Sequence, residues 1–371
     1  MSVVVRSAVV LGLVWMGDAL IYVVMPLHAA AFGIALPWVG LVLSLNRIVR
    51  ILGYGWIEPL SRRVGLRTLV IAGSAAAATS TLAYGMATGI VPLLAARLLW
   101  GVCWGVLNVL TTIYALNAGR SEGRNVGLSR AVSAIGPTLA LTVGAWLASW
   151  LGPQQVFLVL GAVGFLAVPV ALSLPSITDR RADDASPEAS RWRPSSLNIL
   201  YFTLTMAVDG VFTTTLSLLL AQAFGVGAAL LGAGLLLASL RVIAAVMAIA
   251  GGVFVDRFGA RRILGVGMAM IVVALLGVAA GSLYPAAAVI VVARAALATV
   301  GPVLAIGQGG GSRVERLAAF ATWTDCGLAA GPLLAGVLFG RVGVPVLYTT
   351  LASLLALASL LATRDRGRPG S

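Results

Sequence analysis

Long apolar stretches alternate with short polar connections along the whole chain of 371 residues. A helix of about 20 apolar residues crosses the roughly 30 Å hydrocarbon core of a bilayer. The pattern therefore predicts an all-α integral membrane protein with twelve transmembrane helices, which we place at residues 8–28, 35–57, 67–88, 91–116, 125–149, 154–174, 198–221, 228–253, 262–282, 285–306, 317–339 and 342–362.

The composition indicates that lipid, rather than water, surrounds these helices. Hydrophobic residues make up 60% of the chain and charged residues only 10%, with a mean hydropathy of +1.03. Soluble domains are about half apolar and about one quarter charged. We interpret the first apolar run as a retained span and not a cleaved signal peptide, because Asp18 interrupts its apolar core and a matching span recurs later.

The charge distribution predicts the orientation in the membrane. The net charge of +13 comes from arginine, and the connections on one predicted side hold almost all of it, whereas those on the other side hold only Arg341. This positive-inside asymmetry predicts a multi-pass protein of the cell inner membrane with both termini in the cytoplasm. Because the basic residues follow the topology, we expect no nucleic-acid partner.

One polar segment divides the chain into two halves of similar length. Residues 175–196 read "PSITDRRADDASPEASRWRPSS" and are rich in proline, serine and charge, as is typical of a flexible linker. The sequence thus predicts an N-terminal six-helix bundle at 1–174, a cytoplasmic linker at 175–197 and a C-terminal six-helix bundle at 198–371.

The two halves repeat the same unusual residues at a nearly constant distance. Offsets of 191 to 197 residues relate the pairs Asp18 and Asp209, Arg47 and Arg241, Gly65 and Gly259, Arg97 and Arg294, and Gly136-Pro137 and Gly331-Pro332. An internal duplication of a six-helix unit explains this spacing. Such repeats build transporters whose substrate site lies between the halves near the bilayer midplane.

A short loop motif points to a family. The stretch "GGVFVDRFGARR" at 251–262 resembles the loop signature of the major facilitator superfamily, through Gly252, Asp256, Arg257, Gly259, Arg261 and Arg262. The first-half counterpart, "EPLSRRVGLRT" from Glu58, has Arg62 where the signature has its aspartate.

Two further motifs carry the same resemblance. "ARLLWGVCWG" is similar to the fourth-span motif of the family, which implies a part in proton coupling for Arg97. "GLAAGPLLAG" at 327–336, with Gly331 and Pro332, is similar to a glycine-proline motif associated with exporters, although the family has that motif in span five and not in span eleven. The resemblance implies a secondary transporter that acts by alternating access, and we expect it to be a monomer.

The loop motif makes physical sense as a gating latch. Gly252 lets helices approach closely, as small residues do in lipid. Asp256 can pair with an arginine or accept N–H groups at a helix N-terminus, and so hold one face closed. The alternative is a tight basic loop that only sets the topology.

Charges at membrane depth are the candidate functional residues, because each costs several kcal/mol to place there. The predicted spans contain six arginines and three aspartates at this depth: Asp18, Arg47, Arg50, Arg97, Arg130, Asp209, Arg241, Arg294 and Asp325. The excess of positive charge favours a water-filled cavity or an anionic substrate. We therefore predict a substrate site formed by Arg47, Arg130, Arg241, Arg294, Trp323 and Asp325.

Arg130 and Asp325 are expected to act together. Each lies six residues before the Gly-Pro pair of its own half, and the family geometry places their two spans on opposite walls of the cavity. They can form a bridge that substrate or protonation opens. A static structural ion pair is the alternative.

Asp18 is the first candidate for the proton carrier. Burial favours the protonated form of a carboxyl group and a neighbouring arginine favours the charged form, so the pair Asp18 and Arg97 can load and release a proton. Asp209 is the symmetric alternative. A simpler role for either aspartate is to accept hydrogen bonds from its neighbours.

These features predict proton-coupled export of a small anionic or amphipathic molecule, with no cofactor and no enzymatic activity. Import of a nutrient remains an alternative, and sodium or exchange can replace the proton. Met25, His28, Cys103 and Cys326 offer soft ligands, so transport of a transition metal or a metal chelate also stays open. The glycine-rich "GQGGGS" at 307–312 lacks the lysine of a phosphate-binding loop.

Overall fold

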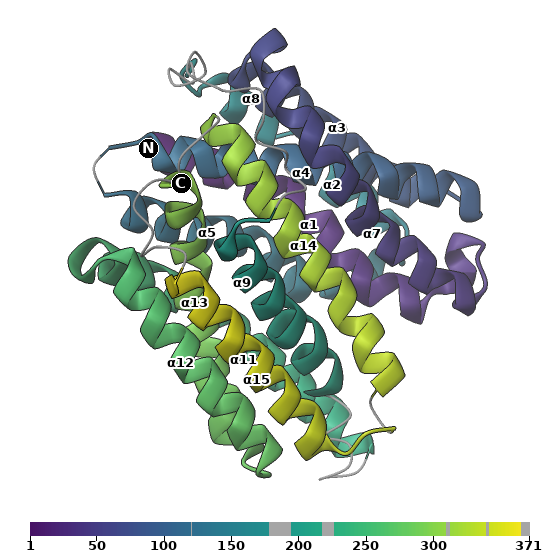
Figure 1. Ribbon diagram of the computed structural model, residues 1–371. Helices are drawn as coiled ribbons and strands as arrows, with labels where there is room; N and C mark the ends of the chain where they lie inside the picture. The colour runs from purple at the N-terminus through teal and green to yellow at the C-terminus, as the bar shows by residue number, and fades with distance from the viewer. Residues whose placement is uncertain (120, 178–193, 217–225, 309–311, 339–340, 365–371) are drawn as a thin grey trace. The chain divides into compact units, whose positions relative to one another are not determined.

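The computed structural model describes the chain outside residues 120, 178–193, 217–225, 309–311, 339–340 and 365–371. In the described helices, the side chains at 27, 36–37, 226–241, 336 and 364 also lie outside the description. Every element of the described part is helical (Figure 1). The all-α prediction is therefore confirmed.

The helices follow the predicted spans closely. Each predicted span corresponds to one helix or to consecutive helical segments: α1 (Val3–Leu27) with the short η1 (Ala29–Phe32), α2 (Leu36–Val64), α3 (Leu66–Met86), α4 (Ile90–Leu116), α5 (Glu122–Leu139) with η2 (Ala140–Gly144) and α6 (Ala145–Leu151), α7 (Gln155–Gly164) with α8 (Ala167–Leu172), α9 (Ser196–Leu204) with η4 (Thr205–Phe212), α11 (Val226–Phe258), α12 (Ala260–Ala279), α13 (Leu283–Ile306), α14 (Arg313–Leu338) and α15 (Val344–Arg364). In the described residues, nine of these helical runs are long and apolar enough to cross a membrane. The other three are α2, α11 and α14.

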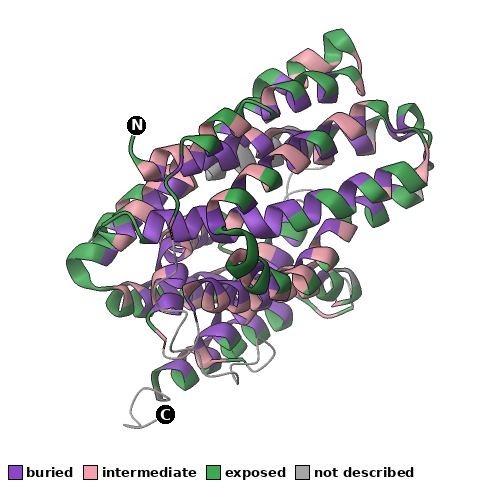
Figure 2. Cartoon of the chain, turned by 90° about the horizontal axis from the view of Figure 1, so that it is seen from above, coloured by how far each residue is buried: buried purple, intermediate pink, exposed green. Residues whose placement is uncertain are grey.

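Large apolar side chains cover much of the outer surface. Trp56, Val91 and Leu333 are each more than 70% exposed, at 73%, 73% and 72%. Buried and exposed positions alternate along the helices (Figure 2). In water such a surface would aggregate, whereas in a bilayer its apolar side chains face lipid and the helical backbone satisfies its own hydrogen bonds.

The chain forms two compact units. The first contains Met1–Pro187 together with Gly310–Ala318, and the second contains Glu188–Gly309 and Ala319–Ser371. The predicted linker at 175–197 lies mostly outside the described residues, so its boundaries stay a prediction. Each unit is described by itself below.

Glycines allow the helices of the first unit to approach closely. A Cβ atom added to Gly136 in α5 would lie 1.9 Å from the carbonyl oxygen of Gly12 in α1. One added to Gly101 in α4 would lie 2.7 Å from the carbonyl oxygen of Asn46 in α2. Small residues at such crossings let backbones pack tightly in lipid. The Gly-Pro pair of the first half thus marks the crossing of α1 and α5.

The second unit uses the same device. A Cβ atom on Gly331 in α14 would lie 2.4 Å from the Cα atom of Gly210 in η4. Gly251 in α11 similarly approaches Ala296 in α13, where an added Cβ atom would lie 2.8 Å from its Cα atom. In both halves, the glycine of the Gly-Pro pair therefore contacts a glycine in the first span of its own half.

Equivalent turns in the two halves share one backbone conformation. Gly65 separates α2 from α3 with φ at 84°, and Gly259 separates α11 from α12 with φ at 84°. Residues with a Cβ atom rarely adopt positive φ, so glycine is favoured at both turns. The internal duplication thus extends to the local backbone geometry.

Two arginines cap the C-terminal end of the last helix of the first half. Arg6 and Arg67 donate from their guanidinium groups to the carbonyl oxygens of Ser173 and Leu172, at the end of α8. The Tyr114 hydroxyl donates to the carbonyl of Pro175 at 2.9 Å. The last carbonyls of a helix lack intrahelical partners and carry partial negative charge, so these cations stabilise the helix end.

Candidate functional site

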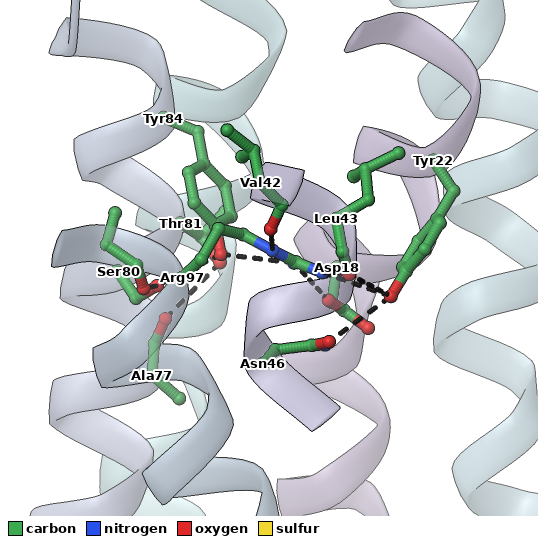
Figure 3. A network of polar contacts seen from close by, with 11 residues as sticks. Asp18, Tyr22, Val42, Leu43, Asn46, Ala77, Ser80, Thr81, Tyr84 and Arg97 are labelled. Atoms are coloured by element: carbon green, nitrogen blue, oxygen red, sulfur yellow. Dashed lines mark hydrogen bonds and ion pairs between the residues drawn. The ribbon is translucent and has the colours of Figure 1, made fainter. Parts of the chain in front are cut away.

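The first unit buries an ion pair in the middle of its helices. Arg97 Nη1 in α4 lies 2.5 Å from Asp18 Oδ1 in α1 (Figure 3). Arg97 is completely buried, and Asp18 is 8% exposed. The sequence predicted that these two residues interact, and the structure brings them together.

Arg97 also donates hydrogen bonds to four acceptors other than Asp18. Its remaining hydrogen bonds run from Nη1 to the Tyr84 hydroxyl at 3.3 Å and from Nη2 to the Tyr22 hydroxyl at 3.1 Å. Two backbone carbonyls of α2 also accept, from Nε at Val42 and from Nη2 at Leu43, each at 3.2 Å. A guanidinium group has five N–H donors, and here five acceptors surround it. The side chain therefore joins α1, α2, α3 and α4.

Further polar contacts fix the two tyrosines (Figure 3). The Tyr22 hydroxyl donates to the Leu43 carbonyl at 3.2 Å, and Ser80 Oγ lies 3.3 Å from the Tyr84 hydroxyl. The guanidinium carbon of Arg97 lies 5.3 Å from the ring centre of Tyr22 and 5.9 Å from that of Tyr84. Cation–π attraction adds to the hydrogen bonds at such distances. We call these residues, Asp18, Tyr22, Tyr84 and Arg97, the N-terminal network.

The second unit contains an ion pair at the equivalent sequence positions. Arg294 Nε in α13 lies 3.0 Å from both carboxylate oxygens of Asp209, and Nη2 lies 2.6 Å from Oδ2. Asp209 lies in η4, a π-helical stretch, a distortion that is frequent at functional sites. Paired arginine nitrogens match the geometry of a carboxylate and bind it strongly.

This second pair is accessible and has few partners. The Arg294 side chain is 21% exposed and the Asp209 side chain 29% exposed. In the described part of the chain, Arg294 hydrogen-bonds only to Asp209, and its Nη1 makes no hydrogen bond. The equivalent pairs therefore differ between the halves. In the first half the pair is buried and every N–H donor of the arginine has an acceptor. In the second half the pair is partly exposed, and we call it the open pair.

The open pair borders a cavity of about 350 Å³ inside the second unit. Among the described residues, Asp209 and Arg294 are its only charged lining residues; the others are Val208, Phe212, Thr213, Leu216, Ala244, Ile290, Val291, Ala295 and Ala298. Ligand pockets are commonly of this kind, largely apolar with a few polar groups that fix the orientation. The cavity can hold a small organic molecule whose polar end reaches the ion pair.

The other predicted substrate residues are spread over both units. Arg130 in α5 donates from Nη1 to Asn108 Oδ1 at 3.0 Å. Asp325 is buried in α14, in the second unit. The predicted bridge between Arg130 and Asp325 joins the two units, so it stays a prediction. Trp323 packs its ring against Phe202, with the ring centres 6.2 Å apart.

Two predicted substrate arginines complete the set. Arg47 lies half-buried in α2. Arg241 lies in α11, but its side chain falls outside the described residues. Their part in the substrate site stays a prediction.

The predicted gating motif lies around the turn between α11 and α12. Asp256, Arg257, Arg261 and Arg262 are all exposed, and Gly252 is buried. The guanidinium carbon of Arg257 lies 5.4 Å from the ring centre of Phe258. The preceding residue, Gly251, makes a close approach to α13, and the approach expected of Gly252 stays a prediction. The latch itself stays a prediction.

The full environment of Arg97 could not be predicted from the sequence. Tyr84 was absent from the predicted site, although Ser80 and Tyr84 lie one helical turn apart on an apolar helix and so mark a polar face. The carbonyls of Val42 and Leu43 have no sequence signature, because every residue carries one. Aromatic packing beside the network was also undefined: the ring centres of Trp15 and Trp104 are 4.5 Å apart, and the guanidinium carbon of Arg50 lies 5.9 Å from the Trp104 ring centre.

The proposed metal ligands belong to both units: Met25, His28 and Cys103 lie in the first and Cys326 in the second. Within the described residues, there is no group of three or more His, Cys, Asp or Glu side chains that could hold a metal ion. Cys103 is buried and Cys326 partly buried, both as free thiols. Met25 is buried and His28 is exposed beyond the end of α1. The metal alternative therefore gains no geometric support in that part of the chain.

Comparison with known proteins places this arrangement in a family. Residues 8–309 match the Major Facilitator Superfamily, and no curated protein matches the chain. Among solved structures, the chain is similar to the human organic anion transporter MFSD10 (TETRAN), with 19% identity, a TM-score of 0.71, and 96% of this chain and 99% of that chain covered.

The E. coli fucose:proton symporter FucP is also similar, with 16% identity, a TM-score of 0.73, and coverage of 99% and 98%. A structure of FucP in the outward conformation gives 15% identity, a TM-score of 0.73 and full coverage of both chains, 100% each. The family match spans most of the chain and both units share the fold of these transporters. This protein belongs to the major facilitator superfamily and is a multi-pass membrane transporter.

Proposed function

We propose that the chain carries a small anionic or amphipathic organic solute by alternating access, coupled to protons at Asp209. Family membership supports secondary transport. The observation that carries the substrate class and the coupling is the partly exposed pair of Asp209 and Arg294 at the wall of a largely apolar cavity of about 350 Å³.

Arg294 can recognise an anion without leaving its place. Nε and Nη2 bind Asp209, whereas Nη1 has no hydrogen bond within the described residues. A carboxylate or phosphate group in the cavity can accept from Nη1. The surrounding apolar side chains, such as Phe212 and Ile290, then contact the hydrocarbon part of the solute.

The ion pair links the proton to the anion. While Asp209 is charged, it neutralises Arg294 and competes with a second anion. Protonation of Asp209 removes its negative charge and so ends that competition. The positive charge of Arg294 is then available to the anionic substrate. Proton and anion therefore bind together. Among the predicted modes this linkage favours symport, whose net direction follows the two gradients.

Asp18 has a different part in this proposal. Its arginine keeps four other acceptors when Asp18 is protonated, so Arg97 has no freedom to turn toward a ligand. We assign Asp18 and Arg97 to holding α1, α2, α3 and α4 in register. Asp18 remains the second candidate for a coupling carboxylate.

The similar structures agree with this proposal only in outline. One is an organic anion transporter and another a fucose:proton symporter. At 19% and 16% identity these likenesses show the fold alone. The substrate class therefore rests on the cavity and its ion pair.

Ligand-dependent unfolding of the purified protein tests the substrate class. Organic anions, lipophilic cations and neutral sugars are added separately, and the unfolding temperature is recorded. A ligand at 100 times its dissociation constant adds about 2.7 kcal/mol to the apparent stability. We expect organic anions to stabilise the protein, the effect to be lost in Arg294→Gln, and Arg62→Gln to respond like the unmodified protein.

Arg62 is a suitable control because it pairs with Glu58 at an exposed position, 47% exposed on the arginine side. Stabilisation by lipophilic cations alone would mean that the aspartates bind a cationic substrate, as in a multidrug exporter. That result would reject the anion proposal.

A further inference from the structure

A second cavity lies on the outside of the second unit, away from the ion pair. It has a volume of about 420 Å³ and runs between α9, α12 and α15. Its lining is Leu200, Arg261, Leu264, Gly265, Met268, Ala269, Val272, Ala356, Ser359, Leu360, Ala362 and Thr363. Among the lining residues that the structure describes, Arg261 is the only charged one. We call this cavity the outer groove.

The absence of a side chain at Gly265 opens the outer groove. A Cβ atom added to this glycine would meet no atom within 4 Å. The equivalent residue in the first half is Ile71, since the turn glycines Gly65 and Gly259 set the local offset to 194. The first half therefore has an isoleucine where the second half has open space.

The arginine at the end of the groove also differs between the halves. Arg67, 194 residues before Arg261, donates to the Leu172 carbonyl and so ties α3 to the last span of its half. Arg261 is exposed and makes no hydrogen bond or ion pair within the part of the chain that the structure describes. Arg67 therefore has a structural role in the first half, whereas its equivalent Arg261 is available to bind a ligand.

The groove begins at a helix N-terminus that attracts anions. Gly259 precedes α12 without a capping side chain, and the first turn of α12 has no acidic residue. Arg261 and Arg262 add two positive charges where the helix dipole is already positive. Asp256, the acidic residue nearest in sequence, is outnumbered by Arg257, Arg261 and Arg262.

The length of the groove matches one lipid chain. From Arg261 to Val272 there are 11 residue steps, which at 1.5 Å per residue span about 16 Å. Half of a roughly 30 Å hydrocarbon core is about the same. The charged end lies on the side that the arginine distribution predicts to be cytoplasmic, where anionic lipids attract basic residues.

We propose that the outer groove binds an anionic phospholipid of this leaflet. The phosphate lies against Arg261 and the uncapped N–H groups at the start of α12. One acyl chain runs along Gly265 and Ala269 toward Val272. A free phosphate ion fits less well, because everything beyond Arg261 is apolar or a hydroxyl already bonded within its own helix, as at Ser359 and Thr363.

Lipid titration of the purified full chain tests the proposal. Phosphatidylglycerol, phosphatidylcholine and inorganic phosphate are each added, and bound lipid is counted by native mass spectrometry alongside the unfolding temperature. We expect phosphatidylglycerol to bind and stabilise above phosphatidylcholine, and inorganic phosphate to have no effect. Arg261→Gln should weaken phosphatidylglycerol binding about fivefold, the contribution of one arginine near the lipid surface.

Two further variants separate the groove from general surface charge. Gly265→Ile restores the first-half residue and fills the groove, so it should also remove the preference for phosphatidylglycerol. Arg262→Gln removes the same charge from a residue that does not line the groove, and it should keep the preference. Equal effects of Arg261→Gln and Arg262→Gln, undiminished binding in Gly265→Ile, or equal binding of both lipids would each overturn the proposal.

Discussion

At the scale of single residues, the two arginines show how environment separates equivalent positions. Arg97 donates to Asp18, two tyrosine hydroxyls and two backbone carbonyls in a fully buried site. Among the residues that the structure describes, Arg294 hydrogen-bonds only to Asp209, and its side chain is partly exposed. Removing one partner of a buried pair leaves an uncompensated charge, whereas water relieves the loss at an exposed one.

The aspartates should therefore differ in their contribution to stability. Asp18→Asn should lower the free energy of unfolding by about 3 kcal/mol, the lower end for breaking a buried pair. Asp209→Asn should have a smaller effect, about 1 kcal/mol or less. Unfolding of both variants in the same detergent, followed by tryptophan fluorescence, compares them directly. A larger loss in Asp209→Asn would reverse the roles given to the two pairs.

The sequence predicts the charged side chains of this site better than the backbone groups around them. Asp18 and Arg97 stand out because charges are expensive in an apolar span, and the repeat points to Asp209 and Arg294 in the same way. The backbone acceptors Val42 and Leu43 carry no such signal. The exposure of each ion pair depends on how several helices pack around it. The sequence therefore could not predict that the first pair is buried and the second partly exposed.

At the scale of helices, close crossings at glycine hold each unit together. The apolar runs predicted the helices well, because lipid leaves a spanning chain no alternative to internal hydrogen bonding. The crossings were less predictable. Gly12 and Gly136 form one together, yet only the Gly-Pro pair had a recognisable motif. At the α11–α13 crossing Gly251 makes a close approach to Ala296, and this glycine was not part of the predicted motif.

Substitution at a crossing should cost far more than substitution at an open glycine. Gly136→Ala places a methyl group against the Gly12 carbonyl, at 1.9 Å before any adjustment, so α1 and α5 must separate. Gly53→Ala in α2 meets nothing within 4 Å and should be neutral or stabilising by about 0.4–1 kcal/mol. Yield and unfolding temperature of the two variants give the comparison. Similar values for both would show that α1 and α5 do not need the close contact.

At the scale of the whole molecule, alternating access requires contacts that form in one state and break in another. Arg130 and Asp325 occupy equivalent positions in the two halves, and they were predicted to bridge the cavity. Arg130 has Asn108 as a partner within its own unit. It can therefore keep a hydrogen bond when the bridge opens.

Exchange of the two charges tests this bridge. Arg130→Asp and Asp325→Arg should each reduce transport strongly, because each places two like charges near one another. The double variant restores an opposite pair and should recover a substantial part of the transport rate. No recovery in a double variant that is folded and present in the membrane would argue against a direct bridge.

In the proposed mechanism, Asp209 couples the proton to the anion. The most direct measurement is the number of protons moved per anion in proteoliposomes, with a pH-sensitive dye inside and a labelled organic anion that stabilises the protein. We predict a fixed ratio for the unmodified protein, and anion movement without protons for Asp209→Asn, whose neutral amide mimics the protonated carboxyl group. An unchanged proton-to-anion ratio in Asp209→Asn would contradict the claim and return the coupling role to Asp18.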